Sequence, residues 1–317
     1  MKKKIRNLID DSKSILLLTH ESPDGDAIGS VLAFYHYLKT IDKDVTMVVF
    51  DIPKVFSFLP AINDILNVDD NKEYDLGIVV DCSTIERIGQ NEDLFGKCKK
   101  TICVDHHASN TKYCDLNYVM KDVSSCCQVI YSLFLDWNVE ISLEIGESIM
   151  AGVLTDTNGF GNNNVDEDTF KLAYDMKKRG IDIYNEYQLL LNRKTMSQYM
   201  LMKIGMERLE FLCDGKIAFT YILEDDFKKV GASLGEHEGI VDIGRNIDGV
   251  LVSIFIREDK GWTISLRSTG LIDVGEIAIS LGGGGHMMAS GGKLIGTFEE
   301  VREKVIKAVE KAITEKR

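Results

Sequence analysis

Four short apolar runs in the first half of the chain are each followed within a few residues by carboxylates, and two of them also by histidines. The runs are 15–18, 76–80, 101–104 and 150–154, and the groups that follow them are His20, Asp24 and Asp26, then Asp81, then Asp105, His106 and His107, and finally Asp156. We interpret these four positions as strand ends. The carboxyl ends of parallel strands meet along one crevice of an open sheet, so residues far apart in the sequence converge there. The pattern therefore predicts a parallel α/β sheet with one acidic site at its edge.

The residue types of this predicted site are those of a metal centre. Hard divalent cations take oxygen ligands, and added imidazole shifts the expected metal from calcium towards manganese, iron or zinc. The acidic and histidine groups are too many for one ion and suit a pair roughly 3.5–4 Å apart that shares a carboxylate. Asp81, which would lie centrally, is the expected bridging ligand. Each Asp could instead be an ordinary helix N-cap, but the convergence of several such ends favours metal ligands.

Charge and composition restrict the kind of partner. The chain has 317 residues and a formal net charge of −13, whereas binding long duplex DNA or RNA needs many phosphate-neutralising Lys and Arg residues. Any polyanionic substrate is therefore expected to be short. The basic residues 1–6 are followed by further charges before a signal-peptide core could form, and the seven cysteines show no regular disulfide spacing. We expect a cytoplasmic protein with no membrane association.

The pattern of apolar residues divides the chain into two domains. Up to about residue 180, short β-rich runs alternate with helical periodicity, which predicts a parallel sheet flanked by helices. The predicted strands are 15–19, 45–50, 76–80 and 101–104, and the predicted helices are 27–38, 125–135, 143–154 and 168–178. Beyond residue 215 we expect a smaller α+β unit with strands 216–222, 250–257 and 262–267, a turn at 259–261 and a last helix 298–316. The expected domains are 1–185 and 214–317, joined by a helical connector, 186–213.

A run of glycines near the C-terminus predicts a second substrate-binding surface. Gly282–Gly285 precede His286, and residues without a Cβ let backbone amides approach an anion closely. We expect a helix to begin after this run and to add the positive end of its dipole. Arg267 and Ser268 end the preceding predicted strand, and a planar guanidinium suits phosphate. For the glycines alone, a flexible turn is the alternative.

With these motifs the sequence resembles the DHH phosphoesterase superfamily, in its RecJ-like subfamily with a C-terminal DHHA1 domain. The resemblance covers nearly the whole chain. The matching positions are, in the order of the family's motifs, His20-x-x-x-Asp24-x-Asp26, Asp81, Asp105-His106-His107, Asp156-Thr157 and Gly282-Gly283-Gly284-Gly285-His286. The compact size is most similar to that of the bifunctional oligoribonucleases, or nanoRNases, of this superfamily.

The resemblance implies two divalent cations, with manganese as the expected metal, and assigns roles to individual residues. One ion would be held by His20, Asp24 and Asp81, and the other by Asp26, Asp81, His106 and Asp156. His107 would contact the scissile phosphate, and we expect Asp105 to orient an adjacent imidazole. The implied substrate-binding residues are His107, Arg87, Arg267, Ser268, Gly283, Gly284, Gly285 and His286.

The expected function is that of a metal-dependent phosphodiesterase and phosphomonoesterase. It would degrade short single-stranded RNA or DNA exonucleolytically and remove the 3′-phosphate of adenosine 3′,5′-bisphosphate, by in-line attack of hydroxide on phosphorus. A cyclic di-AMP or linear dinucleotide phosphodiesterase is one alternative, and a non-catalytic nucleotide sensor is an alternative of another class. A pyrophosphatase is disfavoured by the glycine-histidine run. Strand length, polarity of digestion, RNA or DNA preference and oligomeric state, including a homodimer, are left open by the sequence.

Overall fold

The computed structural model describes residues 1–66 and 72–315. The chain divides into two compact units, Met1–Arg193 and Lys194–Arg317, called unit 1 and unit 2 below. The division falls inside 186–213, the segment for which the sequence predicts a helical connector. The predicted end of the last helix at Lys316 lies outside the described residues.

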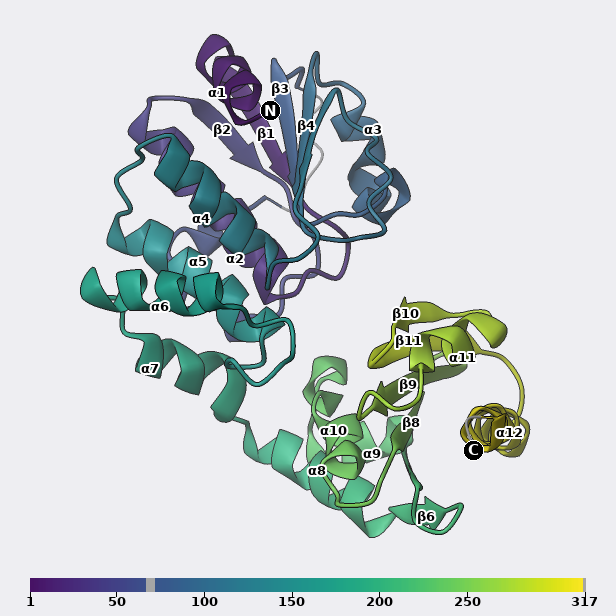
Figure 1. Ribbon diagram of the computed structural model, residues 1–317. Helices are drawn as coiled ribbons and strands as arrows, with labels where there is room; N and C mark the ends of the chain where they lie inside the picture. Colours follow the sequence, from purple (N-terminus) through teal and green to yellow (C-terminus); the bar gives the residue numbers. More distant parts are fainter. Residues whose placement is uncertain (67–71, 316–317) are drawn as a thin grey trace. The chain divides into compact units, whose positions relative to one another are not determined.

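Unit 1 is built on a five-stranded parallel sheet with the strand order β2-β1-β3-β4-β5 (Figure 1). The strands are β1 (Ser14–Leu18), β2 (Asp44–Met47), β3 (Leu76–Val80), β4 (Thr101–Asp105) and β5 (Leu116–Val119). The predicted parallel α/β class is therefore confirmed. Strand β2 ends earlier than predicted because Val48 forms only an isolated bridge, to Leu66. Strand β5 was not predicted from the sequence, since its residues are all only half-buried and include Asn117.

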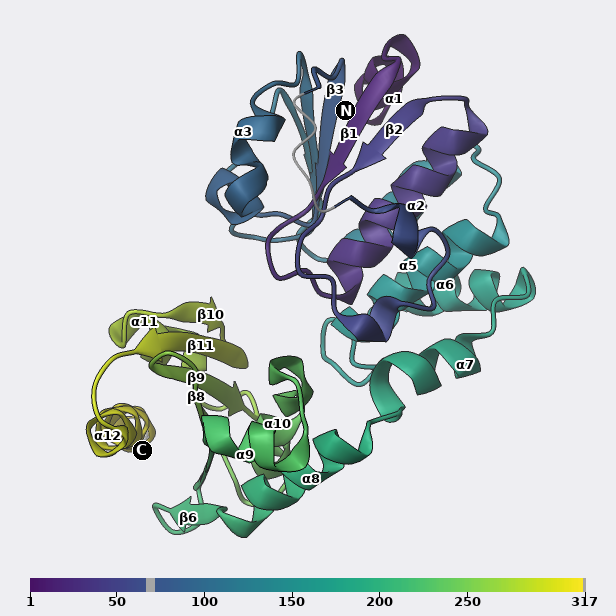
Figure 2. The ribbon, with the colours of Figure 1, turned by 180° about the vertical axis from the view of Figure 1, so that it is seen from behind.

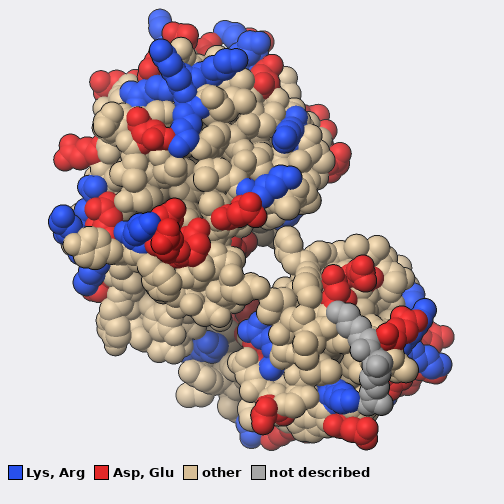
Figure 3. Space-filling view, in the orientation of Figure 1, with Lys and Arg blue, Asp and Glu red and all other residues tan. Residues whose placement is uncertain are grey.

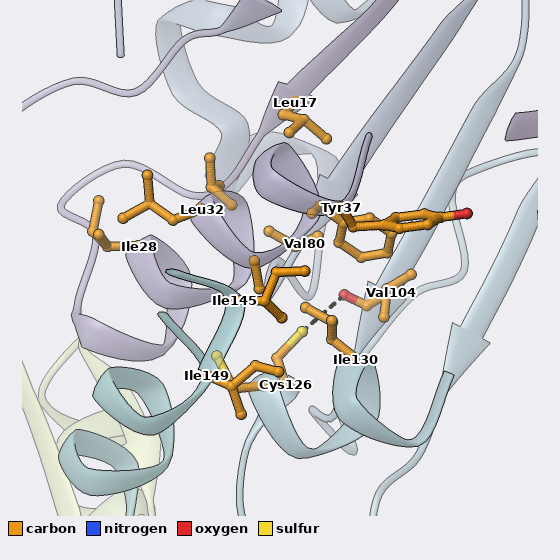
Figure 4. Packing of buried hydrophobic residues seen from close by; sticks show 14 of the residues in the cluster. Leu17, Ile28, Leu32, Tyr37, Val80, Val104, Cys126, Ile130, Ile145 and Ile149 are labelled. Carbon is orange, nitrogen blue, oxygen red and sulfur yellow. Dashed lines mark hydrogen bonds between the residues drawn. The ribbon is translucent and has the colours of Figure 1, made fainter. Parts of the chain in front are cut away.

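Helices cover both faces of this sheet. Ile15 and Leu17 belong to a core shared with α1 (Lys2–Asp11), α2 (Gly25–Thr40), α4 (Cys126–Asp136), α5 (Leu143–Asp156) and α6 (Glu167–Lys178), and Figure 4 shows part of this packing. Leu16 and Leu18 point to the other face, towards η3 (Ile85–Asn91) and α3 (Glu92–Phe95). Because both faces are buried at the centre of the sheet, β1, β3 and β4 are continuous apolar runs rather than alternating ones.

Close packing of α2 against α5 brings together the two helix ends that carry acidic residues (Figures 1 and 2). A Cβ on Gly25 would lie 2.3 Å from Oγ1 of Thr155, and a Cβ on Gly29 would lie 2.3 Å from the Ser148 carbonyl oxygen. Glycine therefore permits this approach. As a result the N-terminus of α2, with Asp24 and Asp26, lies beside the C-terminus of α5.

The predicted helix 143–154 is confirmed as α5, so the interpretation of Asp156 as the end of a strand was wrong, and Asp156 is instead the last residue of that helix. The pattern of a short apolar run does not by itself show whether the run forms a buried strand or part of a buried helix.

Unit 1 also contains α7 (Ile183–Tyr187), the π-helical turn η4 (Gln188–Asn192) and the short helices η1 (Lys54–Phe56) and η2 (Ile62–Asp64).

Unit 2 contains a mixed six-stranded sheet with the order β10-β11-β9-β8-β7-β6, in which only the β7–β8 pair is parallel. The strands are β6 (Glu210–Leu212), β7 (Ile217–Ile222), β8 (Val252–Glu258), β9 (Trp262–Ser268), β10 (Gly284–His286) and β11 (Ala289–Leu294). Helices α11 (Val274–Ser280) and α12 (Phe298–Glu315) pack on one face. The other face is packed against α8 (Met196–Glu207), α9 (Glu224–Val230) and α10 (Ile240–Arg245), next to η5 (Leu234–His237).

The expectation that a helix begins after the glycine run was wrong. The run instead follows helix α11 and forms strand β10 of a tight hairpin with β11. Gly282 has a φ of 87°, a left-handed conformation that is common just beyond a helix end. A Cβ on Gly283 would lie 2.2 Å from the Gly291 carbonyl oxygen, and one on Gly285 would lie 2.5 Å from Cα of Ser290. These glycines therefore allow the hairpin strands to approach closely.

Charged side chains of both signs are interspersed on the face of unit 1 that Figure 3 shows. Over the whole chain the acidic residues outnumber the basic ones, 50 to 37, which gives the formal net charge of −13. No helix among the described residues is both long enough and apolar enough to span a membrane.

Candidate metal centre

Ligand-type side chains gather in unit 1 where β1, β3 and β4 end. They form three groups in which one ligand atom per residue lies within 4.8 Å of the others, namely Asp81, His106 and His107; His20, Asp24 and Asp81; and Asp26, His106 and Asp156. Every residue that the sequence suggested as a metal ligand occurs in these groups. Two of the groups correspond to the two ion sites expected from the sequence, apart from the shared Asp81.

Asp81 lies at the centre of the cluster and faces a different histidine with each oxygen. Its Oδ2 is 3.6 Å from Nε2 of His20, and its Oδ1 is 3.5 Å from Nε2 of His106. These distances are too long for hydrogen bonds. Two ligand atoms that are each about 2.1 Å from one ion lie roughly 3 to 3.5 Å apart, which is close to the observed spacing. Asp81 therefore has the geometry of a carboxylate that bridges two cations.

The surroundings of Asp81 are also suited to a bound cation. The side chain is 2% exposed, and its Oδ1 has no hydrogen-bond partner among the described residues. Burial raises the pKa of Asp81 well above its usual range, and the charges of Asp26, Asp24 and Asp156 raise it further. Burial, together with Asp26 and Asp24, also raises the pKa of Asp156 to about 9. Bound divalent cations would offset this repulsion, so the donor set fits such ions.

His20 is held in the form that a metal ligand needs. Its Nδ1 donates a hydrogen bond to the carbonyl oxygen of Glu21 at 2.9 Å, so the lone pair is on Nε2, which faces Asp81. Burial lowers the pKa of His20, and the positive charge of Arg87 also contributes to that lowering. The imidazole is therefore neutral near pH 7 and able to coordinate an ion.

Backbone groups fix the orientation of Asp26. Its carboxylate accepts hydrogen bonds from the backbone amides of Cys126 at 2.6 Å and Cys127 at 2.9 Å. These amides are at the N-terminus of α4, where hydrogen-bond donors and the helix dipole favour a negative charge. Oδ2 of Asp26 is then 3.8 Å from Nε2 of His106, and Oδ2 of Asp156 is 3.6 Å from the same nitrogen.

Asp105 orients the histidine pair. Its Oδ1 accepts hydrogen bonds from Nδ1 of His107 at 2.7 Å and from the backbone amide of His106 at 2.8 Å. Its Oδ2 accepts one from Nδ2 of Asn110 at 2.6 Å. Burial raises the pKa of Asp105, but the hydrogen bonds from His107 and Asn110 outweigh burial and lower it overall. The carboxylate therefore stays ionised, and the Nδ1 proton of His107 is committed to it.

Arg87 lies next to the cluster, since its carbonyl oxygen accepts a hydrogen bond from the Glu21 amide at 2.8 Å. Its side chain is exposed. The segment that follows Asp81 is therefore hydrogen-bonded to the loop after β1. The exposed side chain of Arg87 lies near His20, which belongs to that loop.

In unit 2, the strand register places Arg267 and His286 in one row across the sheet. His286 of β10 pairs with Ala289 of β11, and Ala289 pairs with Arg267 of β9. Directly paired residues project from the same face of a sheet, and neighbouring strands are about 4.8 Å apart. The two side chains are thus separated by the small side chain of Ala289, on the face opposite α12.

Ser268 does not share that face, because successive residues of a strand alternate. It is fully buried, and its hydroxyl accepts a hydrogen bond from the Gly270 amide at 3.0 Å. Of the glycines, Gly284 has open space where a Cβ would be, whereas Gly283 and Gly285 are packed against β11. Arg267, Gly284 and His286 are therefore the predicted binding residues that this face leaves accessible.

Several supporting residues were missed in the sequence. Asn110 holds Asp105, and the side-chain amides of Asn162 and Asn164 donate to the Asp156 carbonyl oxygen at 3.0 and 3.3 Å. Asn110 follows the two histidines by only three residues, so its position was a usable signal. The amides that hold Asp26 belong to the backbone of Cys126 and Cys127, and the type of a residue does not indicate that its backbone amide binds a carboxylate.

Comparison with known proteins identifies both units. The model of the N-terminal domain of the DHH family matches residues 14–154, and the model of the DHHA1 domain matches residues 214–315. The chain belongs to the DHH family. The resemblance drawn from the sequence motifs is thereby confirmed, and the two matched regions lie in different units of this DHH protein.

Three relatives of this DHH protein cover most of its length. The bifunctional oligoribonuclease and PAP phosphatase NrnA of Thermus thermophilus is 29% identical, with 95% of this chain and 90% of the relative aligned. The NrnA protein of Bacillus subtilis is 26% identical, with 93% of each chain aligned. An exopolyphosphatase-related protein from Bacteroides fragilis has a crystal structure that matches with a TM-score of 0.92 and 30% identity, covering 98% of this chain and 95% of that one.

Proposed function

We propose that this DHH protein is a two-metal phosphoesterase that hydrolyses short oligonucleotides to mononucleotides and removes the 3′-phosphate of adenosine 3′,5′-bisphosphate. The observation that carries the proposal is the position of Asp81, whose two oxygens face two histidines belonging to separate ligand groups. The names of the two NrnA relatives, which align over nearly the whole chain, support the choice of substrates.

In this proposal each group of the cluster has a defined task. His20, Asp24 and Asp81 would hold one divalent cation, and Asp26, Asp81, His106 and Asp156 would hold the other. The cations would lower the pKa of a water molecule and offset the charge on the phosphoryl oxygens. Manganese is our choice among the metals that suit this donor set of oxygen and imidazole.

The remaining residues bind and orient the substrate. His107, with its Nδ1 proton held by Asp105, would present its other ring nitrogen to the scissile phosphate. Arg87 would contact the phosphate, and Arg267, Gly284 and His286, the accessible members of the predicted set in unit 2, would bind another part of the substrate. The negative net charge agrees with a short substrate.

Parallel hydrolysis assays test this function. Purified protein with Mn²⁺ would be incubated with 5′-phosphorylated diadenylate, with adenosine 3′,5′-bisphosphate and with cyclic di-AMP, and the products separated by chromatography. We expect loss of the first two substrates, abolished by Asp81→Ala. Hydrolysis of the cyclic substrate alone would instead assign the protein to the breakdown of cyclic dinucleotides, and no hydrolysis of any would favour a nucleotide sensor.

A further inference from the structure

A strained turn follows Asp156 at the edge of the cluster. Asn158, Gly159 and Phe160 have φ angles of 48°, 64° and 68°, and a left-handed conformation is rare for a bulky residue such as Phe. Hydrogen bonds hold the turn, from the Gly159 amide to the Leu154 carbonyl at 2.7 Å and from the Phe160 amide to Thr157 Oγ1 at 3.0 Å. Such strain persists only where the surroundings fix it, and it is concentrated at functional sites.

The strained residue Phe160 supports an exposed aromatic ring. Its ring stacks on that of Phe170, with centroids 5.7 Å apart and planes 23° apart. Phe160 itself packs against the main core of unit 1, whereas Phe170 is 57% exposed. The pair therefore has a half-buried inner ring, that of Phe160, and an exposed outer ring, that of Phe170, which is accessible to a planar ligand.

Phe160 is connected to the cluster through Asp156. Nδ2 of Asn162 donates to the Asp156 carbonyl oxygen at 3.0 Å, and the Asn162 amide donates to the Thr157 carbonyl oxygen at 2.9 Å. The turn is thus folded back onto the end of α5, and Phe160 lies only four residues beyond Asp156.

Phe170 is connected to the cluster by a second route. It lies near the start of α6, whose N-cap residue Asp166 accepts hydrogen bonds from Nε2 of Gln128 at 3.2 and 3.3 Å. Gln128 is in the first turn of α4, and the first amides of α4 bind Asp26. Both rings are therefore held by segments that also hold a carboxylate of the cluster.

We propose that the Phe160–Phe170 pair stacks the nucleobase of the nucleotide whose phosphate is hydrolysed at the cluster. This inference rests on the proposed function and identifies a binding surface for the base in unit 1. Stacking on aromatic side chains tolerates every base, since each base has a π face. It would let an acidic protein hold short strands with few phosphate contacts and without reading their sequence.

The kinetic test compares substrates with and without a base. Phe170→Ala is expected to raise KM for 5′-phosphorylated diadenylate about tenfold or more with little change in kcat. The comparison substrates are two analogues of diadenylate, each lacking one of its two bases, and the analogue without the stacked base should show no such rise. Phe170→Trp should restore the wild-type KM. Tyr174→Ala, which removes another exposed aromatic ring one turn further along α6, is the matched control and should behave as wild type.

Two kinetic results would overturn the inference. One is an unchanged KM for diadenylate in Phe170→Ala. The other is an equal loss for diadenylate and for both analogues, which would mean that the ring only supports the fold.

A binding experiment separates this inference from the proposed function. In Phe170→Trp with Mn²⁺, AMP should quench tryptophan fluorescence beyond any change in the wild type, whereas ribose 5-phosphate should not. If no substrate is hydrolysed but AMP quenches, the proposed function is wrong and the stacking surface stands. Equal effects of AMP and ribose 5-phosphate, or none, would refute the stacking surface even in an active enzyme.

Discussion

At the scale of single residues, the clearest property of the cluster is that the carboxyl group of Asp81 is buried among other carboxylates, which disfavour its negative charge. A buried carboxylate surrounded by like charges destabilises the folded protein unless cations are present. Asp81 is therefore the residue at which metal binding and stability are most directly linked.

Asp81→Asn should separate these two effects. The change removes a buried negative charge, so the metal-free protein should unfold at the same temperature as wild type or higher at neutral pH. Mn²⁺ should raise the melting temperature of wild type by mass action but have little effect on the variant. Thermal unfolding with Mn²⁺ and with EDTA measures both. An equal rise with Mn²⁺ in both proteins would show that Asp81 does not hold the metal.

Asn110 offers a test of how the histidine pair is positioned. Asn110→Ala removes the hydrogen bond to Asp105, and loss of such an outer partner commonly costs about 10- to 100-fold in activity or metal affinity. We expect the loss in kcat, with Mn²⁺ affinity nearly unchanged, because Asp105 holds the ring of His107 but contacts the proposed ligand His106 only at its backbone amide. Steady-state kinetics and a Mn²⁺ titration measure the two quantities.

Asn117→Ala is the matched control for this experiment. Its side-chain amide, in strand β5, likewise donates a hydrogen bond, but to the backbone carbonyl of Cys114 at 2.7 Å rather than to a residue of the cluster. If both variants lose activity equally, loop stability rather than the orientation of Asp105 is responsible.

At the scale of secondary structure elements, the sequence predicted both the strands that carry the cluster and the helices α2, α4, α5 and α6, and the error was to interpret the end of α5 also as a strand end. Strands β1, β3 and β4 are buried on both faces, so their apolar runs are unambiguous, and the acidic residues after them could be grouped correctly. Residues 150–154 have the same composition inside a buried helix. The glycine run was misinterpreted because glycine fits equally an anion-binding loop and a tight hairpin, and only the partner strand β11 distinguishes them.

Helix α7 contains a carboxylate that should make stability depend on pH. Glu186 is 3% exposed, neither of its oxygens has a hydrogen-bond partner within the described residues, and burial, aided by Glu147 and Asp182, raises its pKa to about 9. The unfolded chain loses this proton near pH 4.5. Between these values the folded state binds more protons, so stability falls as pH rises, by at most about 1.4 kcal/mol per pH unit.

Glu186→Gln should remove this dependence. The variant is expected to be more stable than wild type at pH 8, and the difference should vanish near pH 4.5. Denaturant unfolding at several pH values measures the difference, in which other titrating groups cancel. Glu167→Gln, at a side chain that is 85% exposed, serves as the control. A constant difference across the pH range would mean that Glu186 keeps an ordinary pKa.

At the scale of the whole molecule, the division into two units separates the proposed metal ligands from part of the proposed substrate contacts. Unit 1 has its own hydrophobic core and contains all residues of the three ligand groups. Unit 2 contributes Arg267 and His286. The sequence predicted both units through their motifs, but the exact division, between residues 193 and 194, depends on contacts that no motif encodes.

A protein comprising residues 1–193 should therefore fold cooperatively and bind Mn²⁺ with the stoichiometry of the full chain. Its KM for diadenylate should be at least about tenfold higher, since contacts in unit 2 are missing. Calorimetry measures the unfolding and the metal stoichiometry, and the hydrolysis assay measures KM. An isolated unit 1 that folds but binds no Mn²⁺ would contradict the assignment of every ligand to this unit.

The backbone conformation of Asp81 also restricts how this position can change over evolution. Its φ of 52° is readily adopted by Gly, Asn and Asp but is unfavourable for other residues. Asn and Gly keep the conformation and lose the charge, whereas Glu keeps the charge in a strained and longer side chain. No single substitution preserves both properties. The central carboxylate is thus expected to be lost abruptly with activity, rather than to drift through functional intermediates.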